Sequence, residues 1–233
     1  MNILSIDTSN QLLGLAILKD GKVAGEYTTN VKKNHSVRLM PAIDQLMEQT
    51  AIAPEELDRI VVAKGPGSYT GVRIGLATAK TMGWALNIPV VGISSLAAVA
   101  LQGLFHEGLI CPFFDARRGL VYTGLYQFNE QGKLEQVEEE TNILFVDWLE
   151  NIKNRKQKIL FLSQDMELHK ETILEKLGEQ AIIPPMPCQY PRPSLMAWAG
   201  ASEQPNSIHA LTPEYLRLAE AEAKWLERQQ ENN

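Results

Sequence analysis

The fold of this chain is decided by the stretch GPGSYTGVRIG, residues 65–75. It follows the apolar segment Ile60–Ala63, which is typical of a buried strand, and it precedes a pattern typical of a helix. Its glycines and proline favour a stiff turn in which the backbone can approach another group closely. Ser68 or Thr70 can cap the helix that follows, and the free N–H groups at its positive end could hold an anion. The stretch thus predicts a tight strand-to-helix connection, with an anion-binding turn as the alternative.

The turn departs from two common phosphate-binding motifs. A P-loop has a lysine directly after its last glycine, and the chain contains no Gly-x-x-x-x-Gly-Lys sequence. In a dinucleotide-binding loop the third glycine comes about three residues after the second. Here Gly67 is followed only by Gly71, and Pro66 removes a backbone donor. Close packing is therefore the favoured interpretation of the turn.

Composition limits the partners and the compartment. The chain has 233 residues, of which 45% are hydrophobic and 21% are charged, as in an ordinary soluble globular protein. Its net charge is −6 and it has no basic run longer than two residues, so direct nucleic-acid binding is expected to be weak. Cys111 and Cys188 lack the spacing of a metal or redox site, which favours free thiols in a reducing compartment.

No signal peptide or membrane span is expected. The N-terminus runs directly into the strand pattern Asn2–Asp7, without a basic region or a cleavage site. The segment Thr81–Phe105 has 25 residues without a charge, which is long enough to cross a bilayer. However, Asn87–Pro89 and Ser94-Ser95 divide it into a helix end, a strand and a helix start. We expect a cytoplasmic protein in which this segment is buried core.

The order of the elements is that of a duplicated unit. In the first half, strands are expected at 2–7, 12–19 and 22–29, with a hairpin turn at Asp20-Gly21 between the last two. They are followed by a helix at 34–50, a strand at 59–64, a helix at 70–86, a strand at 89–93 and a helix from Ser94 or Ser95. The second half repeats this order with strands at 109–115, 120–128 and 133–140, a helix at 145–151, a strand at 158–163, a helix at 168–177 and a strand at 181–183. Each half therefore reads β-β-β-α-β-α-β, followed by a further helix.

Three regions follow from this order. They are an N-terminal lobe over 1–106, a C-terminal lobe over 107–205, and a helix and tail over 206–233 that pack back between the lobes. The proline-rich stretch Pro184–Pro193 marks a connection, and a helix is expected around 195–202. Thr212-Pro213 is expected to begin a last, charged helix that runs to about Arg228.

A duplicated α/β unit of this kind is the plan of the actin, hexokinase and Hsp70 superfamily. In that superfamily the aspartate that ends the first strand lines a nucleotide cleft between two lobes. Asp7 is either such a residue, able to orient a magnesium-bound nucleotide, or a carboxylate hydrogen-bonded to its own turn. Residues of a vestigial nucleotide or anion site would be Asp7, Thr8, Ser9, Gly67, Ser68 and, at the corresponding position of the second half, Asp115.

Two helices carry a candidate interface. The helix over 34–50 places four apolar residues on one stripe: Val37, Met40, Ile43 and Met47. The helix over 70–86 carries four small residues at i+4 spacing: Gly71, Gly75, Ala79 and Gly83. Because glycine costs roughly 1 kcal/mol against alanine in a helix, close packing should compensate for it. The two helices either pack only within the chain or form a docking surface that supports a two-fold dimer of the isolated protein.

The chain resembles the TsaB (YeaZ) family over most of its length. The resemblance is carried by the Gly-Pro-Gly turn and by ILSIDTS (3–9), NHSVRLMP (34–41), DAR (115–117) with Val121-Tyr122, and PEYLR (213–217). The family usually has Glu before the Val-Tyr pair, where this chain has Leu120, which weakens any role given to that side chain.

This resemblance implies a subunit without catalytic residues, cofactor or metal. The family is an inactive relative of TsaD, which binds ATP and transfers the threonylcarbamoyl group to adenosine in tRNAs that read ANN codons. By this resemblance, the chain forms a heterodimer with TsaD through its N-terminal lobe. The ATPase TsaE docks on that pair, and tRNA binds only to the complex. Without TsaD, a homodimer is implied.

Other functions remain open. TsaD-like proteins hold a metal with two histidines on the helix after the first hairpin, and here that helix offers only His35. An ATP-dependent kinase or ATPase of the same superfamily would need a second phosphate loop and an adenosine pocket. A peptidase acting on TsaD would need a nucleophile, and no Gly-x-Ser-x-Gly sequence is present.

Overall fold

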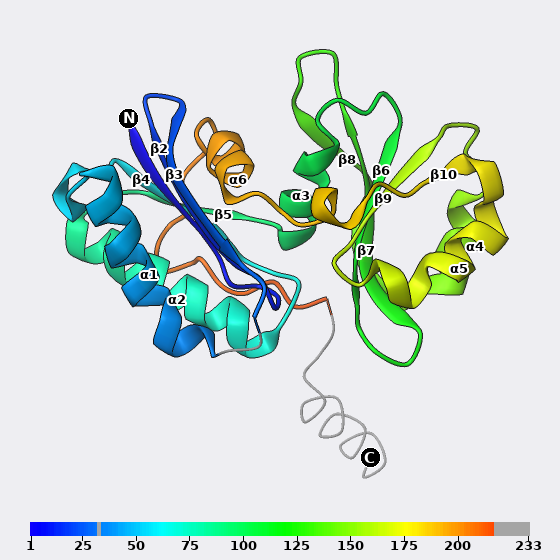
Figure 1. Ribbon diagram of the computed structural model, residues 1–233, viewed down its shortest axis with the longest axis horizontal. Coiled ribbons are helices and arrows are strands. Elements are labelled where there is room, and N and C mark those ends of the chain that lie inside the picture. Colours follow the sequence, from blue (N-terminus) through cyan, green and yellow to red (C-terminus); the bar gives the residue numbers. More distant parts are fainter. Residues whose placement is uncertain (32–33, 217–233) are drawn as a thin grey trace, which may run out of the picture.

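Two mixed five-stranded sheets lie side by side in the computed structural model, which describes residues 1–31 and 34–216 (Figure 1). The first sheet has the order β3-β2-β1-β4-β5, with β1 (Asn2–Asp7), β2 (Leu13–Lys19), β3 (Lys22–Thr29), β4 (Arg59–Ala63) and β5 (Val90–Ile93). The second has the order β10-β9-β6-β7-β8, with β6 (Leu109–Asp115), β7 (Leu120–Phe128), β8 (Leu134–Leu144), β9 (Ile159–Leu162) and β10 (Ala181–Ile182).

The two sheets repeat one topology, as predicted. In each, a central strand (β1 or β6) pairs antiparallel with the next strand and parallel with the fourth strand of its own unit. The predicted turn between β2 and β3 is confirmed: Asp20 and Gly21 both have positive φ, and Lys19 pairs with Lys22. Asp7 and Asp115 therefore end equivalent strands, as the sequence predicted.

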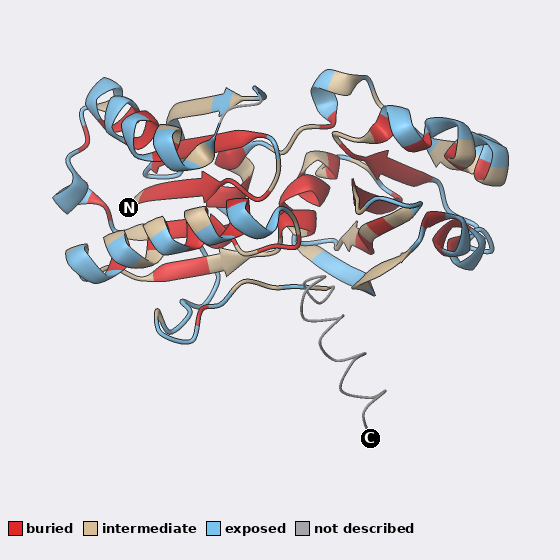
Figure 2. Cartoon of the chain, turned by 90° about the horizontal axis from the view of Figure 1, so that it is seen from below, coloured by how far each residue is buried: buried red, intermediate tan, exposed pale blue. Residues whose placement is uncertain are grey.

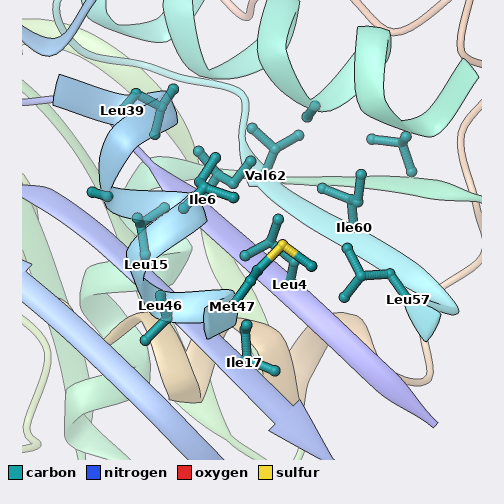
Figure 3. Packing of buried hydrophobic residues seen from close by; sticks show 14 of the residues in the cluster. Leu4, Ile6, Leu15, Ile17, Leu39, Leu46, Met47, Leu57, Ile60 and Val62 are labelled. Carbon is teal, nitrogen blue, oxygen red and sulfur yellow. The ribbon is translucent and has the colours of Figure 1, made fainter. Parts of the chain in front are cut away.

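Helices α1 (His35–Thr50) and α2 (Tyr69–Leu86) cover one face of the first sheet. Figure 3 shows that Met47 of α1 points into the core, beside Leu4 of β1 and Ile17 of β2. In the second lobe, α4 (Phe145–Ile152) and α5 (Met166–Leu177) cover the outer face of the sheet. Figure 2 shows the result, with buried strands between helices whose outer sides are exposed.

The lobes exchange one helix each. α3 (Ser95–Ala100) follows β5 of the first sheet, yet Val99 packs with Ile110 on the second sheet. α6 (Pro193–Gly200) follows the second sheet and packs on the first, where a Cβ added to Gly200 would lie 2.5 Å from Val61. The sheets fall within the predicted regions 1–106 and 107–205, but in space each lobe includes a helix from the other half of the chain.

The segment after α6 runs along the first lobe. Asn206 donates to the carbonyl of Val90, and Glu214 donates to that of Lys64. The helix predicted from Thr212 differs from the structure at its start, since 212–216 contains no helix, and the rest of it lies outside the described residues. The N–H of Glu214 donates to the first lobe there, whereas a helix beginning at Thr212 would leave it free for a capping side chain.

The uncharged segment 81–105 is divided among α2, β5 and α3, as predicted. Short 3₁₀ turns occur at Pro54–Glu56, Leu101–Gly103, Gly178–Gln180 and Met186–Cys188. No helix in the described part of the chain combines the length and apolarity needed to cross a bilayer.

The stripe of small residues on α2 faces its own sheet. Ala79 is 0% exposed, and a Cβ on Gly83 would lie 2.4 Å from Val90. Gly71 and Gly75 are buried against the loop that follows β1. This corrects the expectation that Gly71, Gly75, Ala79 and Gly83 are free for a partner, because close packing on the sheet already uses them.

Half of the apolar stripe on α1 is also core. Ile43 and Met47 are buried against the first sheet, whereas Val37 is 67% and Met40 is 51% exposed. The assignment of Ile43 and Met47 to a partner surface is corrected in the same way. Helical spacing groups the four residues, but the sheet covers only the side on which Ile43 and Met47 lie.

Ala79→Leu should lower the free energy of unfolding by about 1–3 kcal/mol, because the added carbons have no room against the sheet. The matched control is Ala77→Leu on the exposed side of α2. It should change stability by less than about 0.5 kcal/mol. Urea unfolding followed by circular dichroism measures both, and equal effects would contradict the packing of this stripe.

Candidate functional site

The Gly-Pro-Gly turn is closed by the loop that follows β1. The N–H of Ser68 donates to the carbonyl of Ser9 at 2.6 Å. A Cβ on Gly67 would lie 2.2 Å from that carbonyl oxygen, and a Cβ on Gly71 would lie 2.2 Å from the carbonyl of Thr8. The glycines are therefore needed for contact between two parts of the same backbone, which supports the tight-connection interpretation.

Of the two capping residues that the sequence offered, Ser68 caps α2 and Thr70 does not. Its Oγ accepts from the N–H of Gly71 at 3.2 Å, while its own N–H is taken by Ser9. Thr8 adds a further bond, because its Oγ1 donates to the carbonyl of Gly71 at 2.7 Å. The first turn of α2 and the loop after β1 are thus joined by both backbone and side-chain bonds.

Asp7 is buried and bonded within its own turn. Its Oδ1 accepts from the N–H of Ser9 at 2.9 Å and from the Ser9 Oγ at 2.7 Å. Burial raises the pKa of the Asp7 carboxyl, and the two bonds from Ser9 oppose that rise. This geometry supports the interpretation of Asp7 as a strand-end carboxylate held by the turn, with Ser9 rather than Thr8 as its partner.

Asp115 has a different environment in the second lobe. Its Oδ1 lies 3.0 Å from Nε2 of His169, and its N–H donates to Asp165 at 3.0 Å. His169 is buried, and its ring meets those of Phe113 and Phe145 edge-on. Sequence reasoning treated His169 as an isolated residue. Its i+4 spacing from Asp165, the N-cap residue of α5, placed it near that aspartate, but no local signal paired it with Asp115.

Metal-ligating side chains do not gather in the described ranges 1–31 and 34–216, where no group of three or more could hold an ion. His35, at the start of α1, instead places its Nε2 2.7 Å from the carbonyl oxygen of Asn10. The predicted site residues therefore form two separate sets, one around the turn and one around Asp115.

The C-terminal motif packs against the Gly-Pro-Gly turn. Glu214 forms an ion pair with Lys64 at 2.8 Å, and Tyr215 stacks on Tyr69 with ring centroids 5.2 Å apart. The Arg73 guanidinium lies 4.0 Å from the Tyr69 ring centroid, and its Nε donates to the Tyr215 hydroxyl at 2.7 Å. The sequence pointed to both motifs, but nothing local predicted that they meet.

The outward side of α2 is almost uncharged. Its exposed residues are Tyr69, Thr70, Arg73, Ala77, Thr81, Trp84 and Ala85, and only Arg73 carries a charge. Trp84 is 73% exposed. α1 lies beside α2, and its exposed large apolar residues are Val37 and Met40. We call these exposed residues of α1 and α2 the outer helix face. Sequence reasoning missed the α2 part because it followed the glycine stripe on the opposite side.

Gly71→Ala should destabilise the protein by about 1–3 kcal/mol, since the new Cβ would meet the carbonyl of Thr8. The sign is informative, because the same change at an exposed helical position stabilises by about 1 kcal/mol. Thr70→Ala, at the exposed neighbouring position, is the control and should shift stability by less than about 0.5 kcal/mol. Thermal unfolding distinguishes the variants, and a gain for Gly71→Ala would overturn the interlocked turn.

Comparison with known proteins covers the whole chain. A family model described as "TsaD: tRNA N6-adenosine threonylcarbamoyltransferase" matches residues 22–225. A Bacillus subtilis protein named "tRNA threonylcarbamoyladenosine biosynthesis protein TsaB" is 52% identical over 229 residues, covering 98% of this chain and 100% of that protein. An Escherichia coli protein of the same name is 30% identical over 135 residues, covering 57% of this chain and 58% of that protein.

The fold has a solved counterpart. The structure titled "YeaZ from Pseudomonas aeruginosa" matches with a TM-score of 0.76 at 22% identity, covering 92% of this chain and 99% of that chain. At this identity the likeness concerns the fold alone. The match to the Bacillus subtilis protein extends from end to end, and it includes the turn, the loop after β1 and the Pro-Glu-Tyr motif that the structure brings together. By that match, the chain belongs to the TsaB family.

Proposed function

We propose that this protein is a non-catalytic subunit in the synthesis of threonylcarbamoyladenosine in tRNA, where it completes a TsaD-type enzyme. The family supports the pathway, since the Bacillus subtilis relative is named for that biosynthesis. The observation that carries the non-catalytic part is the closed turn. The carbonyl of Ser9 accepts from the N–H of Ser68, and Ser9 donates twice to Oδ1 of Asp7, so these groups, which could otherwise face a nucleotide's phosphates, are engaged within the chain.

The partner surface in this proposal is the outer helix face. A helix that exposes Ala77 and Thr81 on a nearly uncharged side allows another helix to approach within about 8–10 Å. Val37, Met40 and Trp84 supply apolar and aromatic contacts of the kind that anchor interfaces. TsaD would dock here, a second copy would take its place when TsaD is absent, TsaE would join the pair, and tRNA would be met only through the complex.

Met40→Asp and Ala77→Trp should each abolish co-elution with a TsaD homologue in size-exclusion chromatography. The first places an unpaired charge in an apolar contact, and the second prevents close helix approach. Both positions are exposed, so circular dichroism should remain unchanged. Leu168→Asp, at an exposed apolar position of α5 in the other lobe, is the matched control and should still co-elute. If both variants fold and bind TsaD like the wild type, this surface assignment fails.

The purified chain alone should not hydrolyse ATP in steady state. A kinase or ATPase of the same superfamily would turn over or bind ATP, which a phosphate-release assay and calorimetry measure directly. A peptidase acting on TsaD would cleave it and respond to serine- or metal-directed inhibitors. Steady hydrolysis that Asp7→Ala removes would replace the scaffold proposal with an enzyme.

A further inference from the structure

A cleft of about 850 Å³ opens between the two sheets. One wall is formed by β5 and the start of α3, and the other by β8 and the turn before it. The segment that follows α6 closes it from a third side. A volume of this size is in the range of small-molecule sites, roughly 300–1,000 Å³. None of the residues predicted for a nucleotide or anion site lines it.

A β-bulge directs two neighbouring carboxylates toward this cleft. Thr123 pairs with Thr141 and Leu125 pairs with Glu138, so Glu139 and Glu140 together oppose the single residue Gly124. In a regular strand, consecutive side chains point to opposite faces. Here both glutamates line the cleft, and bulges are known to redirect side chains in this way.

These two carboxylates are the unbalanced charges of the cleft. Its other charged residues form ion pairs across its rim, Lys64 with Glu214 at 2.8 Å and Lys133 with Glu203 at 3.2 Å. Within the described part of the chain, neither Glu139 nor Glu140 has an ion-pair partner. The cleft therefore carries an excess of negative charge.

Glu140 is fixed in place but incompletely bonded. Its Oε1 accepts from the hydroxyls of Ser94, which caps α3, and Tyr126, so it links the two lobes. Its Oε2 is buried and has no hydrogen-bond partner among the described residues. Burial raises the pKa of the Glu140 carboxyl, and the hydrogen bonds from Ser94 and Tyr126 and the charge of Lys64 only partly oppose that rise. A buried carboxylate oxygen without a hydrogen bond destabilises the folded protein unless a donor binds to it.

Apolar side chains line the cleft among polar ones. Leu101 and Leu134 line it beside Gln131, Gln136 and Asn206, and Trp198 at the end of α6 lines it while remaining partly exposed. An aromatic face of this kind attracts organic cations as well as hydrocarbon. The combination selects a ligand with a positive end and an apolar body over an anion or a bare metal ion.

We infer that this cleft binds a small organic cation of the alkyl-amine class, with an ammonium group at Glu140 and Glu139 and its hydrocarbon part against Trp198. The occupant pairs with carboxylates that β8 contributes and packs on a helix that belongs to the other lobe. It thereby joins the two halves of the chain at the point where Ser94 and Glu140 already meet.

Calorimetric titration of the full chain with cadaverine at physiological salt tests this inference. Pentylamine and pentanediol, which match its length with fewer charges, should bind progressively more weakly. Glu140→Gln keeps an acceptor for Ser94 and Tyr126 but removes the charge, and it should weaken cadaverine binding at least about tenfold. Trp198→Ala, at a partly exposed position, should weaken it as well.

The matched control is Glu135→Gln. Glu135 lies on the same strand, is exposed, and bonds to Asn129 outside the cleft, so this variant should bind cadaverine like the wild type. Absence of binding to the wild type would overturn the inference. Equal loss in Glu135→Gln and Glu140→Gln would also overturn it, because it would reduce the effect to general attraction toward an acidic protein. Neither outcome depends on TsaD binding.

Discussion

The interlock between the Gly-Pro-Gly turn and the loop after β1 is the contact on which the rest of the structure depends. The carbonyls of Thr8 and Ser9 occupy the space where side chains of Gly71 and Gly67 would be. This lets α2 begin directly over the end of β1, and its small residues then continue along the sheet. Any larger residue at either glycine would move α2 away from the first sheet, and with it the outer helix face.

The interlock also bears on function. In open α/β sheets, ligands bind in the crevice outside the carboxyl ends of the strands. Here the turn's donor and the adjacent aspartate find their partners within the chain, at distances of ordinary hydrogen bonds. The turn thus uses these groups for its own packing, and the subunit role proposed above builds on that observation.

The exchange of α3 and α6 makes the two lobes dependent on each other. α6 buries its apolar side on the first sheet and α3 packs Leu96, Val99 and Ala100 with the second, so each lobe has a core cluster that draws residues from both halves of the chain. The cleft beside β5 and β8 follows from that exchange, because Ser94 at the start of α3 meets Glu140 of β8 there. A change in the distance between the lobes would therefore alter the shape of the cleft as well as the packing of the core.

Local elements could be predicted from the sequence. Period, turn residues and caps identified the repeated strand and helix order, the Asp20-Gly21 hairpin and a cap at Ser68 or Thr70, because each depends on neighbours a few residues away. Which side of each helix is free became clear only from the folded arrangement. Helical spacing groups Ala79 with Gly83 and Met40 with Met47, but it cannot say which side a sheet will cover. The meetings of Tyr215 with Arg73, of His169 with Asp115 and of Glu140 with Ser94 were equally invisible, because each joins segments far apart in the chain through contacts that only the folded backbone creates.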